Sequence, residues 1–398
     1  MKKAMMYLSG VKSGYFMLLA CLVLLAGVIS CSDDNLETDF PEGSGQLSNA
    51  ELIERALSKL PPTRANGNMP VVMVTKSDSI RIVGQLNGRM IINWGDGSQD
   101  TTALNHLIQT HTYTDNEECH VIFLEGLPSA MRKLWILQNK LIYLDIANNT
   151  ELTLLRCVKN ELESLDLTGC DALEIVAVID NNLHSIDVSH LKQLQILELE
   201  GNELERADIS NHPMLHTLNL GRNPIKELNL SNNPQLIFLL LERLPIETLN
   251  HLAVTDSSFI GFPGLPRLEY LDVSGASFTS LDISNNPDLH TLDISDGSIT
   301  RLNISNGEIA SVNASNSKLT ELIYTPNKIL NLYDLRIDGT PFEESSSNLY
   351  PLLTSGLPDR TKPDKYGNVR QGGLYTDMKA LVNPFLTYLE KKNWVVYP

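Results

Sequence analysis

The feature that most constrains this 398-residue chain is an apolar pattern that repeats about every 21 residues. One series of apolar positions comprises Leu134, Leu155, Val176, Leu197, Leu218, Leu239, Leu271, Leu292, Val312 and Leu335. A second series follows ten residues behind and comprises Leu144, Leu165, Ile186, Ala207, Leu228, Leu249, Leu281, Leu302 and Leu322. Because a unit of this length cannot bury its apolar side chains alone, neighbouring units must stack and share one core.

An asparagine stands five residues after each of the first five positions, at Asn139, Asn160, Asn181, Asn202 and Asn223. This L-x-(L/I/V)-x-x-N-x-L pattern resembles the leucine-rich repeat. The resemblance implies a β-rich, right-handed solenoid of about ten coils with a parallel β-sheet, whose asparagines bond turn backbone groups. The later equivalents are Leu244, Ala276, Gly297, Ser317 and Thr340. We therefore expect the later coils to be less regular.

One interval of the repeat is longer than the others, because Leu239 and Leu271 lie 32 residues apart. The added residues, at about 250–266, form an extra half-turn if Leu252 and Val254 continue the strand spacing. The alternative is a binding loop that carries Phe259 and Phe262, because insertions in repeats map to loops on one face. Both interpretations remain open.

The N-terminal segment, residues 1–30, reads as a secretory signal, with Lys2, Lys3 and Lys12 before an apolar run. That run is shorter than the ~20 residues that a membrane-spanning helix requires. The sequence before Cys31 resembles a bacterial lipobox, which implies that Cys31 carries lipid. Ser32-Asp33-Asp34 resembles the export tag of Bacteroidales lipoproteins. The resemblance implies lipid anchoring at the cell surface, on the outer membrane.

The formal charge of the chain is −17, and removal of the three lysines of the signal changes it to −17 − 3 = −20. Such an acidic balance disfavours nucleic acid and anionic membranes as partners. We therefore expect attachment to the membrane through the lipid alone. Residues 31–70 read as a tether that holds one short helix, which begins after a cap at Ser48 or Asn49 and ends before Pro61-Pro62.

Residues 71–126 contain alternating apolar runs separated by turns, which predict a small β-sandwich. The sequence Trp94-Gly95-Asp96-Gly97, followed by His111-Thr112-Tyr113, resembles the PKD-type immunoglobulin-like domain in a shortened form. Asp96 between two glycines favours a tight turn, which needs positive φ. Asp96 as a calcium ligand is the alternative. His111 is expected to pack within a strand.

Residues 343–398 lose the repeat and are expected to form a C-terminal cap. Residues 345–353 and 376–392 read as helical, with Leu381, Phe385, Leu386, Leu389, Trp394 and Val396 suited to cover the last coil. The runs Gly356–Thr361 and Lys392–Val396 resemble the closing segment of Bacteroidales leucine-rich-repeat lipoproteins. Together with the signal, the Trp-Gly-Asp-Gly turn and the repeat, this resemblance covers nearly the whole chain.

Motifs for catalysis, phosphate binding or metal binding are missing from the sequence. Cys119, Cys157 and Cys170 remain after the signal and the anchor, and we expect Cys157 and Cys170 to pack as small apolar groups. A bridge between Cys157 and Cys170 is the alternative. We therefore expect no enzyme, no cofactor and no metal site.

The candidate ligand surface is the concave side of the parallel sheet, where the residues between the strand leucines point outward. The candidate residues are Trp135, Leu137, Arg156, Val158, Ile179, Glu198, Glu200, Glu242, Asp272 and Asp293. The early coils present apolar side chains and the later coils present acids. Asp272 and Asp293 fall on neighbouring strands, where they form either a solvated acidic face or a carboxylate pair for a metal or glycoside hydrolysis. We expect Arg156 and Arg336 to help the acidic face only at a distance.

These features predict a monomeric binding protein that acts in adhesion or macromolecular recognition. A protein ligand is favoured because, among the expected concave positions, only Trp135 offers an aromatic platform for a glycan. The alternative is an accessory subunit of an outer-membrane nutrient-capture assembly that binds glycans, and a glycoside hydrolase is a distant third.

Overall fold

The computed structural model describes residues 47–60, 71–250, 252–253, 260–305, 308–325, 331–344, 352, 357–361, 371–376 and 386–397. The expectations for the signal, Cys31, Val254, Phe259, Leu381, Phe385 and the helix at 345–353 concern segments that lie wholly or mostly outside these ranges. Residues 48–398 form one compact unit. Within the described residues, no helix is both long and apolar enough to cross a membrane.

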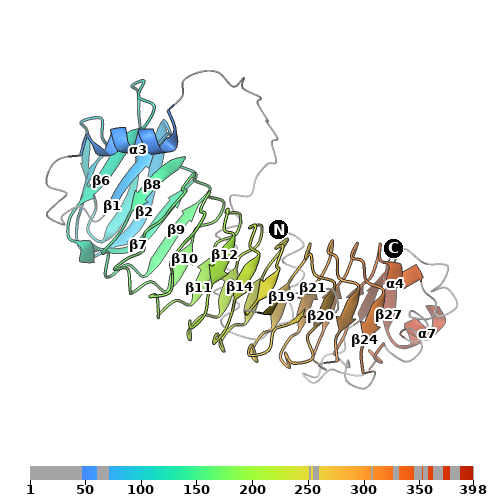
Figure 1. Ribbon diagram of the computed structural model, residues 1–398. Coiled ribbons are helices and arrows are strands. Elements are labelled where there is room, and N and C mark those ends of the chain that lie inside the picture. The colour runs from blue at the N-terminus through green and yellow to red at the C-terminus, as the bar shows by residue number, and fades with distance from the viewer. Residues whose placement is uncertain are drawn as a thin grey trace. The chain divides into compact units, whose positions relative to one another are not determined.

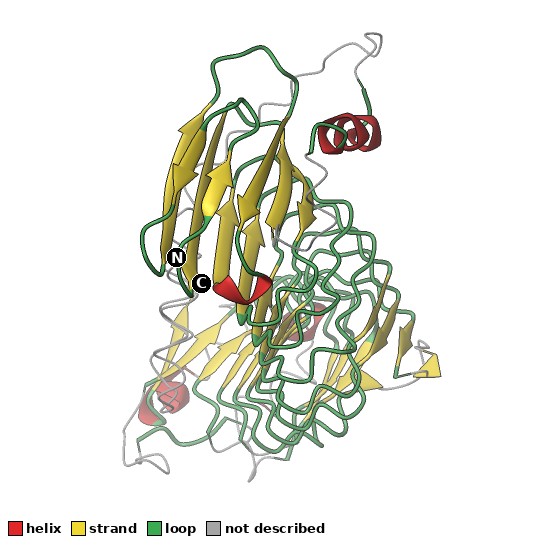
Figure 2. Cartoon of the chain, turned by 90° about the vertical axis from the view of Figure 1, so that its left-hand side faces the viewer, coloured by secondary structure: helices red, strands yellow, loops and turns green. Residues whose placement is uncertain are grey.

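The N-terminal strands of this unit belong to two sheets, which pack face to face (Figures 1 and 2). The strands are β1 (Val71–Thr75), β2 (Ser79–Leu86), β3 (Ile91–Asn93), β4 (Gln99–Thr101), β5 (His106–Thr112) and β6 (His120–Glu125). Along β2 alternate residues are buried, as expected for a strand with one face on the core. The first sheet has the order β4-β3-β6-β1-β8, where β8 (Leu141–Asp145) already belongs to the first coil.

The second sheet, called the long sheet below, has 14 strands and continues from the N-terminal strands through every coil. Its order is β27-β26-β25-β23-β21-β19-β15-β13-β11-β10-β9-β7-β2-β5. The coil strands are β7 (Met131–Leu137), β9 (Leu154–Val158), β10 (Ile175–Ala177), β11 (Ile196–Glu198), β13 (Thr217–Asn219), β15 (Phe238–Leu240), β19 (Tyr270–Asp272), β21 (Thr291–Asp293), β23 (Ser311–Asn313) and β25 (Asp334–Arg336). A short 3-10 helix, η3 (Pro128–Ala130), precedes β7. No break therefore separates the N-terminal strands from the repeat.

The ten predicted strand positions lie at the centre of this sheet and face the core. Leu155, for example, pairs in register with Leu134 and Val176, and all three are fully buried. One apolar cluster runs from Val71 to Trp394 through all coils. The prediction of ten stacked coils with a shared core is confirmed.

The opposite side of the coils carries two shorter sheets. They consist of β12 (Arg206–Asp208), β14 (Glu227–Asn229), β16 (Thr248–Leu249) and β17 (Leu252–Ala253), and of β18 (Ile260–Gly261), β20 (Ser280–Asp282), β22 (Arg301–Asn303) and β24 (Glu321–Ile323). The longer interval of the repeat falls between them, where β16 and β17 pair antiparallel. Phe262 is buried, only 1% exposed. Its assignment to a binding loop is wrong, because its side chain belongs to the continuous apolar core.

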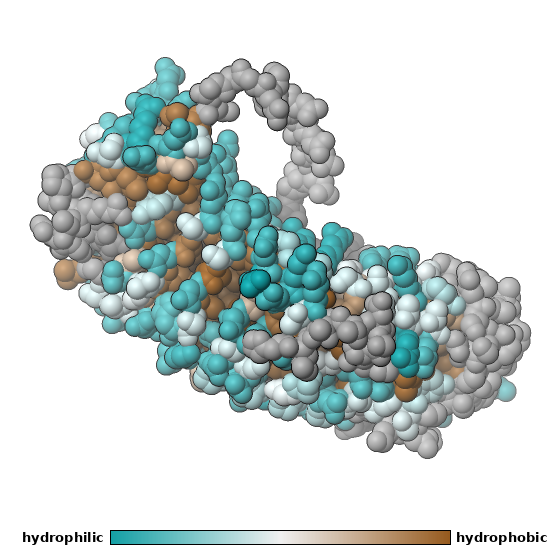
Figure 3. Space-filling view, in the orientation of Figure 1, coloured by the Kyte–Doolittle hydropathy of each residue, from teal (hydrophilic) through white to brown (hydrophobic). Residues whose placement is uncertain are grey.

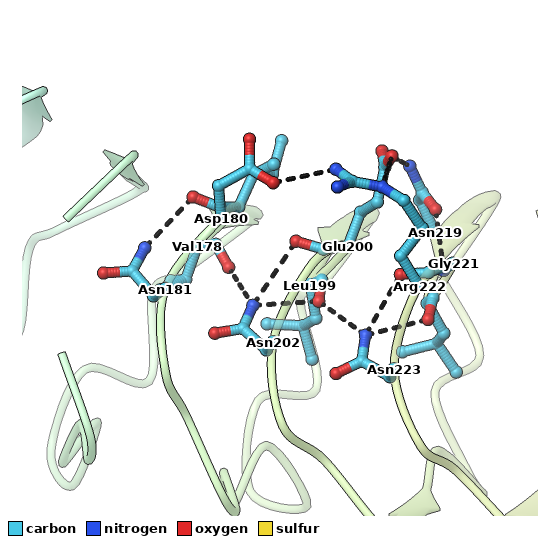
Figure 4. A network of polar contacts seen from close by, with 12 residues as sticks. Val178, Asp180, Asn181, Leu199, Glu200, Asn202, Asn219, Gly221, Arg222 and Asn223 are labelled. Atoms are coloured by element: carbon cyan, nitrogen blue, oxygen red, sulfur yellow. Dashed lines mark hydrogen bonds and ion pairs between the residues drawn. The ribbon is translucent and has the colours of Figure 1, made fainter. Parts of the chain in front are cut away.

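The asparagine ladder is present, as Figure 4 shows for three of its members. Asn202 donates from Nδ2 to the carbonyl oxygens of Val178 (2.7 Å) and Leu199 (2.9 Å), and its Oδ1 accepts from the Leu183 amide (3.1 Å). The corresponding bonds recur at Asn160, Asn181 and Asn223. Asn139 instead exchanges two hydrogen bonds with the backbone of Arg81 in β2. The first member of the ladder thus fastens the first coil to the N-terminal strands.

A second ladder, which was not predicted from the sequence, runs along the other turn of the coils. Asn233 donates from Nδ2 to the carbonyl oxygen of Ile209 at 2.7 Å and accepts from the backbone amide of His212 at 3.0 Å. Nε2 of His212 lies 2.9 Å from the carbonyl oxygen of Val188. Asn149, Cys170 and Asn286 bond turn carbonyls in the same way. In several coils the residue of this ladder stands three positions after a buried apolar residue, as Asn149 does after Ile146, His212 after Ile209 and Asn233 after Leu230, whereas Leu191 occupies the equivalent position after Val188.

The predicted helix after Ser48 is α3 (Asn49–Leu57), and Ser48 forms a capping box with Glu51. Leu52 and Ala56 are buried in a small apolar cluster with Val72, Val74, Cys119, Val121 and Ile142. The prediction that this helix belongs to a tether is therefore wrong. The helix is packed on the first sheet, and its apolar face has the three- and four-residue spacing that such packing needs.

The C-terminal segment departs from the helical cap expected from sequence. Beyond α4 (Pro341–Glu344), β26 (Gly372–Tyr375) and β27 (Trp394–Tyr397) add two parallel strands to the long sheet, with α7 (Leu386–Lys391) before the last one. Trp394 is buried and donates from Nε1 to the carbonyl oxygen of Pro358 at 2.8 Å. Leu389 and Trp394 do cover the last coils, but Trp394 and Val396 lie on a strand.

Candidate functional site

The outward face of the long sheet, predicted above as the concave side, carries most of the candidate residues. Register pairing joins Trp135 to Arg156 and Ala177 to both Arg156 and Glu198, and Asp272 lies opposite Asp293. The early apolar residues Trp135, Leu137, Val158 and Ile179 are half-buried on this face. The structure thus places the apolar candidates on the first coils and the carboxylates on later ones.

Arg156 pairs directly with a carboxylate on a nearby strand of its own part of the face, a contact that the sequence did not predict. Its side chain is only 8% exposed and reaches across Ala177, so that Nη2 lies 3.5 Å from Oε2 of Glu198. Burial raises the pKa of the Glu198 carboxyl, an effect that Arg156 opposes and Glu200 increases. This ion pair connects β9 to β11 across β10 on the outward face of the sheet.

Glu200 also belongs to an internal network, drawn in Figure 4. Its Oε1 accepts from Arg222 Nε at 2.9 Å and its Oε2 accepts from Asn219 Nδ2 at 2.8 Å. Arg222 donates further to Asp180 at 2.8 Å. Both carboxylate oxygens of Glu200 accept hydrogen bonds within the protein, so this candidate residue holds Asn219 and Arg222 in place and does not present an unpaired charge.

The acidic part of the face is centred on Asp272. Burial raises the pKa of its carboxyl to about 6, with Asp293 and Glu242 adding to the rise and bonds from Ser274 opposing it. Asp293 accepts from Asn313 Nδ2 at 2.8 Å and from Ser295 Oγ at 2.6 Å. Asp272 and Asp293 are register partners on neighbouring strands, as predicted, and each carboxylate also accepts hydrogen bonds from neutral donors.

Aromatic side chains on this face are more numerous than the sequence suggests. Phe238 and Tyr270 are register partners whose ring centroids lie 6.3 Å apart. At the C-terminal end, Tyr375 and Tyr397 stack at 4.8 Å, and the Arg336 guanidinium lies 4.5 Å from the Tyr375 ring. The statement that only Trp135 offers an aromatic platform is wrong. Phe238 and Tyr270 directly precede the strand leucines, and Tyr375 and Tyr397 lie on two strands that do not carry the repeat.

The Trp94 turn among the N-terminal strands has the predicted tight geometry, with positive φ at Gly95 and Gly97. Asp96 Oδ1 accepts from Ser98, and its Oδ2 lies 2.7 Å from Nε2 of His111. Although burial raises the pKa of Asp96, these bonds bring it down to about 2. The His111 ring stacks on Trp94 at 4.8 Å, as expected of a packed strand residue.

The described cysteines and metal-ligand residue types are the remaining candidates for chemistry. In the part of the chain that the structure describes, no three His, Cys, Asp or Glu side chains group to hold a metal. Cys119, Cys157 and Cys170 are free and buried. Burial raises the pKa of the Cys157 thiol to about 12, and its only opposing influence is a bond with Asn160. The predicted packing of Cys157 as a small apolar group is confirmed.

Hydropathy divides the surface along the solenoid. Figure 3 shows apolar surface gathered around the N-terminal strands and first coils, while the later coils are mainly hydrophilic on the side shown.

The decisive observation on the architecture is the stacking of coils of about 21 residues in one register, with an asparagine ladder inside the turn. The fold is a leucine-rich-repeat solenoid. No protein-family model and no curated protein matches this chain.

Solved structures that resemble the chain are leucine-rich-repeat proteins. One is the functional domain of InlJ from Listeria monocytogenes, which includes a cysteine ladder, with 18% identity over 55% of this chain and 61% of that chain (TM-score 0.34). Another is the leucine-rich-repeat protein LIC12759 of Leptospira interrogans, with 22% identity over 51% and 64% (TM-score 0.33). The leucine-rich-repeat domain of APL1B shares 14% identity over 62% and 81% (TM-score 0.32). The chain spans less than two thirds of the first two.

Proposed function

We propose that this protein is a lipid-anchored cell-surface binding protein that recognises a protein partner through the outward face of the long sheet. The observation that carries the proposal is the division of that face. Half-buried apolar groups at Trp135, Leu137, Val158 and Ile179 lie on the early coils, and carboxylates at Asp272 and Asp293 lie on later strands of the same continuous sheet. Contiguous apolar side chains on an otherwise polar surface are typical of interaction sites. The role is binding, without a catalytic step.

An array of host proteins and glycans, probed with the purified chain from Ser32 onward, tests this function. The expected result is binding of a protein that is weakened by Trp135→Ala combined with Ile179→Ser. The matched control is Met214→Ser, which changes an exposed apolar residue in a coil turn outside the long sheet. If the double variant and the Met214→Ser control weakened binding equally, the binding site would lie elsewhere.

The location at the cell surface rests on Cys31 and has its own test. Cys31→Ala removes the thiol that would carry the lipid, so labelled palmitate should enter the wild-type protein and not the variant. The control is Cys21→Ala, which alters a cysteine within the signal. Equal labelling of wild type and Cys31→Ala would end the lipoprotein proposal.

A second candidate function is glycan binding within an outer-membrane nutrient-capture assembly, favoured by the aromatic pair Phe238–Tyr270. Aromatic faces offer large, rigid apolar surfaces with a polar handle at tyrosine. On a glycan array, Tyr270→Ala should abolish any signal that depends on this pair. Phe123→Ala, on the first sheet, is the control. A glycan signal that persists in Tyr270→Ala would remove this support.

A further inference from the structure

The outward face of the long sheet does not end with the first coil. Val83 of β2 lies opposite Trp135 of β7 on one side and opposite Ile108 of β5 on the other. Directly opposed residues of neighbouring strands project from the same face of a sheet. Ile108, Val83, Trp135, Leu137 and Val158 therefore form one apolar band, called the junction face here, which crosses from the N-terminal strands into the solenoid.

The most exposed member of the junction face lies on the N-terminal strands. Ile108 is 62% exposed on β5, which is an edge strand of the long sheet, while its neighbour Leu107 is fully buried in the core. The burial of Leu107 fixes the outward direction of Ile108, because successive side chains of a strand point to opposite faces. A large β-branched side chain is thus displayed at the end of the band and is not needed for the core.

Charge is unevenly placed on the same face. Outward positions of β5, β2, β7, β9 and β10 include no Asp or Glu, although the chain has a formal charge of −17. Instead, Arg81 stands two residues before Val83, and Lys133 stands two residues before Trp135. Along the outward face from β5, the first carboxylate is that of Glu198 on β11, which forms an ion pair with Arg156. The junction face is therefore an apolar band bordered by cations.

We propose that the junction face binds a protein segment whose apolar residues are accompanied by carboxylates, so that the N-terminal strands form part of the ligand site. The inference rests on the proposed function and extends it, because it names a partner chemistry and adds β2 and β5 to the surface. Apolar contacts with Ile108 and Val83 supply affinity, and Arg81 and Lys133 select acidic residues beside them. The later carboxylates then face a different, basic part of the same partner.

Phage-displayed random dodecapeptides, selected on the immobilised full chain, test this partner chemistry. The wild-type protein should enrich peptides that combine apolar residues with Asp or Glu. Ile108→Ser should lower their recovery about tenfold, because a few central apolar contacts carry most of the binding energy of an interface. Arg81→Glu should remove or reverse the preference for acidic residues. Met214→Ser is the control and should leave the enriched peptides unchanged. Unfolding midpoints equal to that of the wild type establish that each variant is folded.

The other outcomes separate this inference from the proposed function. If Ile108→Ser and Arg81→Glu still bound the selected peptides, but Asp272→Asn combined with Asp293→Asn did not, the junction face would not be the site. The outward face of the solenoid would then remain the binding site. Peptides that no variant on the long sheet affects contradict both. Enrichment of basic peptides by the junction face, or no enrichment above the phage background, also contradicts the inference.

Discussion

Asn181 shows how single residues hold the turns of the coils. Its Nδ2 donates to the carbonyl oxygens of Cys157 (2.9 Å) and Ile179 (3.1 Å), and its Oδ1 accepts from the Leu162 amide (3.2 Å). Asn181→Ala would remove the side-chain bonds to the Cys157 carbonyl and the Leu162 amide, while the Ile179 carbonyl still accepts from the Lys159 amide at 2.9 Å. The loss of these bonds to buried backbone groups should cost about 1–3 kcal/mol. Ser317 occupies the equivalent later position, is buried, and its Oγ has no hydrogen-bond partner among the described residues. Ser317→Ala should therefore cost less, and urea midpoints in the opposite order would refute the ladder argument.

Asp272 gives a second prediction at this scale, through its pKa of about 6 in the folded protein against 3.8 for an ordinary aspartate. Because the folded pKa lies above the unfolded one, the native state holds the proton more tightly, and stability is lost as pH rises through this interval. Asp272→Asn should therefore stabilise the protein by about 1–3 kcal/mol at about pH 8 and by almost nothing at about pH 3. The amide oxygen can still accept from Ser274.

Urea denaturation of wild type and Asp272→Asn at these two pH values measures the effect. Asp282→Asn, on the other side of the coils, is the control and should show no such gain. A substituted protein that is no more stable than the wild type at the higher pH would show that Asp272 ionises without cost.

The single residues also show what sequence can and cannot predict. The ladder asparagines were predictable because one residue type recurs at one spacing. The second ladder escaped because Asn149, Cys170, His212 and Asn233 are chemically different groups that perform one task. The burial of Arg156 could not be read from sequence, since it depends on the small side chain of Ala177 and the carboxylate of Glu198 on two further strands.

Among the elements, α3 is held by a core of its own. Leu52 and Ala56 pack on the first sheet in a cluster separate from the main core, and Arg55 and Lys59 pair with Glu117 at 3.2 and 3.1 Å. These ion pairs are more than 40% exposed, so apolar contact must dominate the docking of the helix. Leu52→Ala should weaken the helix locally by about 2–4 kcal/mol and leave the solenoid intact.

Hydrogen exchange of the α3 amides, measured beside the global unfolding midpoint, checks this prediction. Faster exchange confined to residues 49–57 with an unchanged midpoint is the expected result. Glu54→Ala alters an exposed position of the same helix and should leave the exchange rates unaltered. A lowered global midpoint in Leu52→Ala would mean that α3 and the solenoid unfold together.

At the two ends of the solenoid, strands or their pairing partners could not be predicted from the sequence. β26 has the sequence Gly-Gly-Leu-Tyr, which shows neither the repeat nor an apolar alternation, yet Leu374 pairs in register with Leu335. Gly372 is needed there because a Cβ would lie 2.4 Å from the Trp394 ring. At the other end, β2 was predicted as a strand, but its pairing with β7 could not be, since an antiparallel partner leaves no periodic signal.

For the whole molecule, the continuous core from Val71 to Trp394 means that both ends of the solenoid are closed by strands of its own sheet. Solenoids require such closing units because an open last coil would expose its apolar face. The outward face of the same sheet is therefore uninterrupted from β5 to β27. One partner can contact the apolar early coils and the acidic later coils together.

This arrangement predicts separate effects on the two rates of partner binding. Charges at Asp272 and Asp293 act over a distance and steer a basic region of the partner, whereas apolar contacts at Trp135 and Ile179 form only on docking. Once the partner is known, Asp272→Asn with Asp293→Asn should slow association, and added salt should slow association of the wild type. Trp135→Ala with Ile179→Ser should instead speed dissociation about tenfold or more. Surface plasmon resonance at two salt concentrations measures both rates. If the neutralised pair changed only the dissociation rate, the acids would be direct contacts and not steering charges.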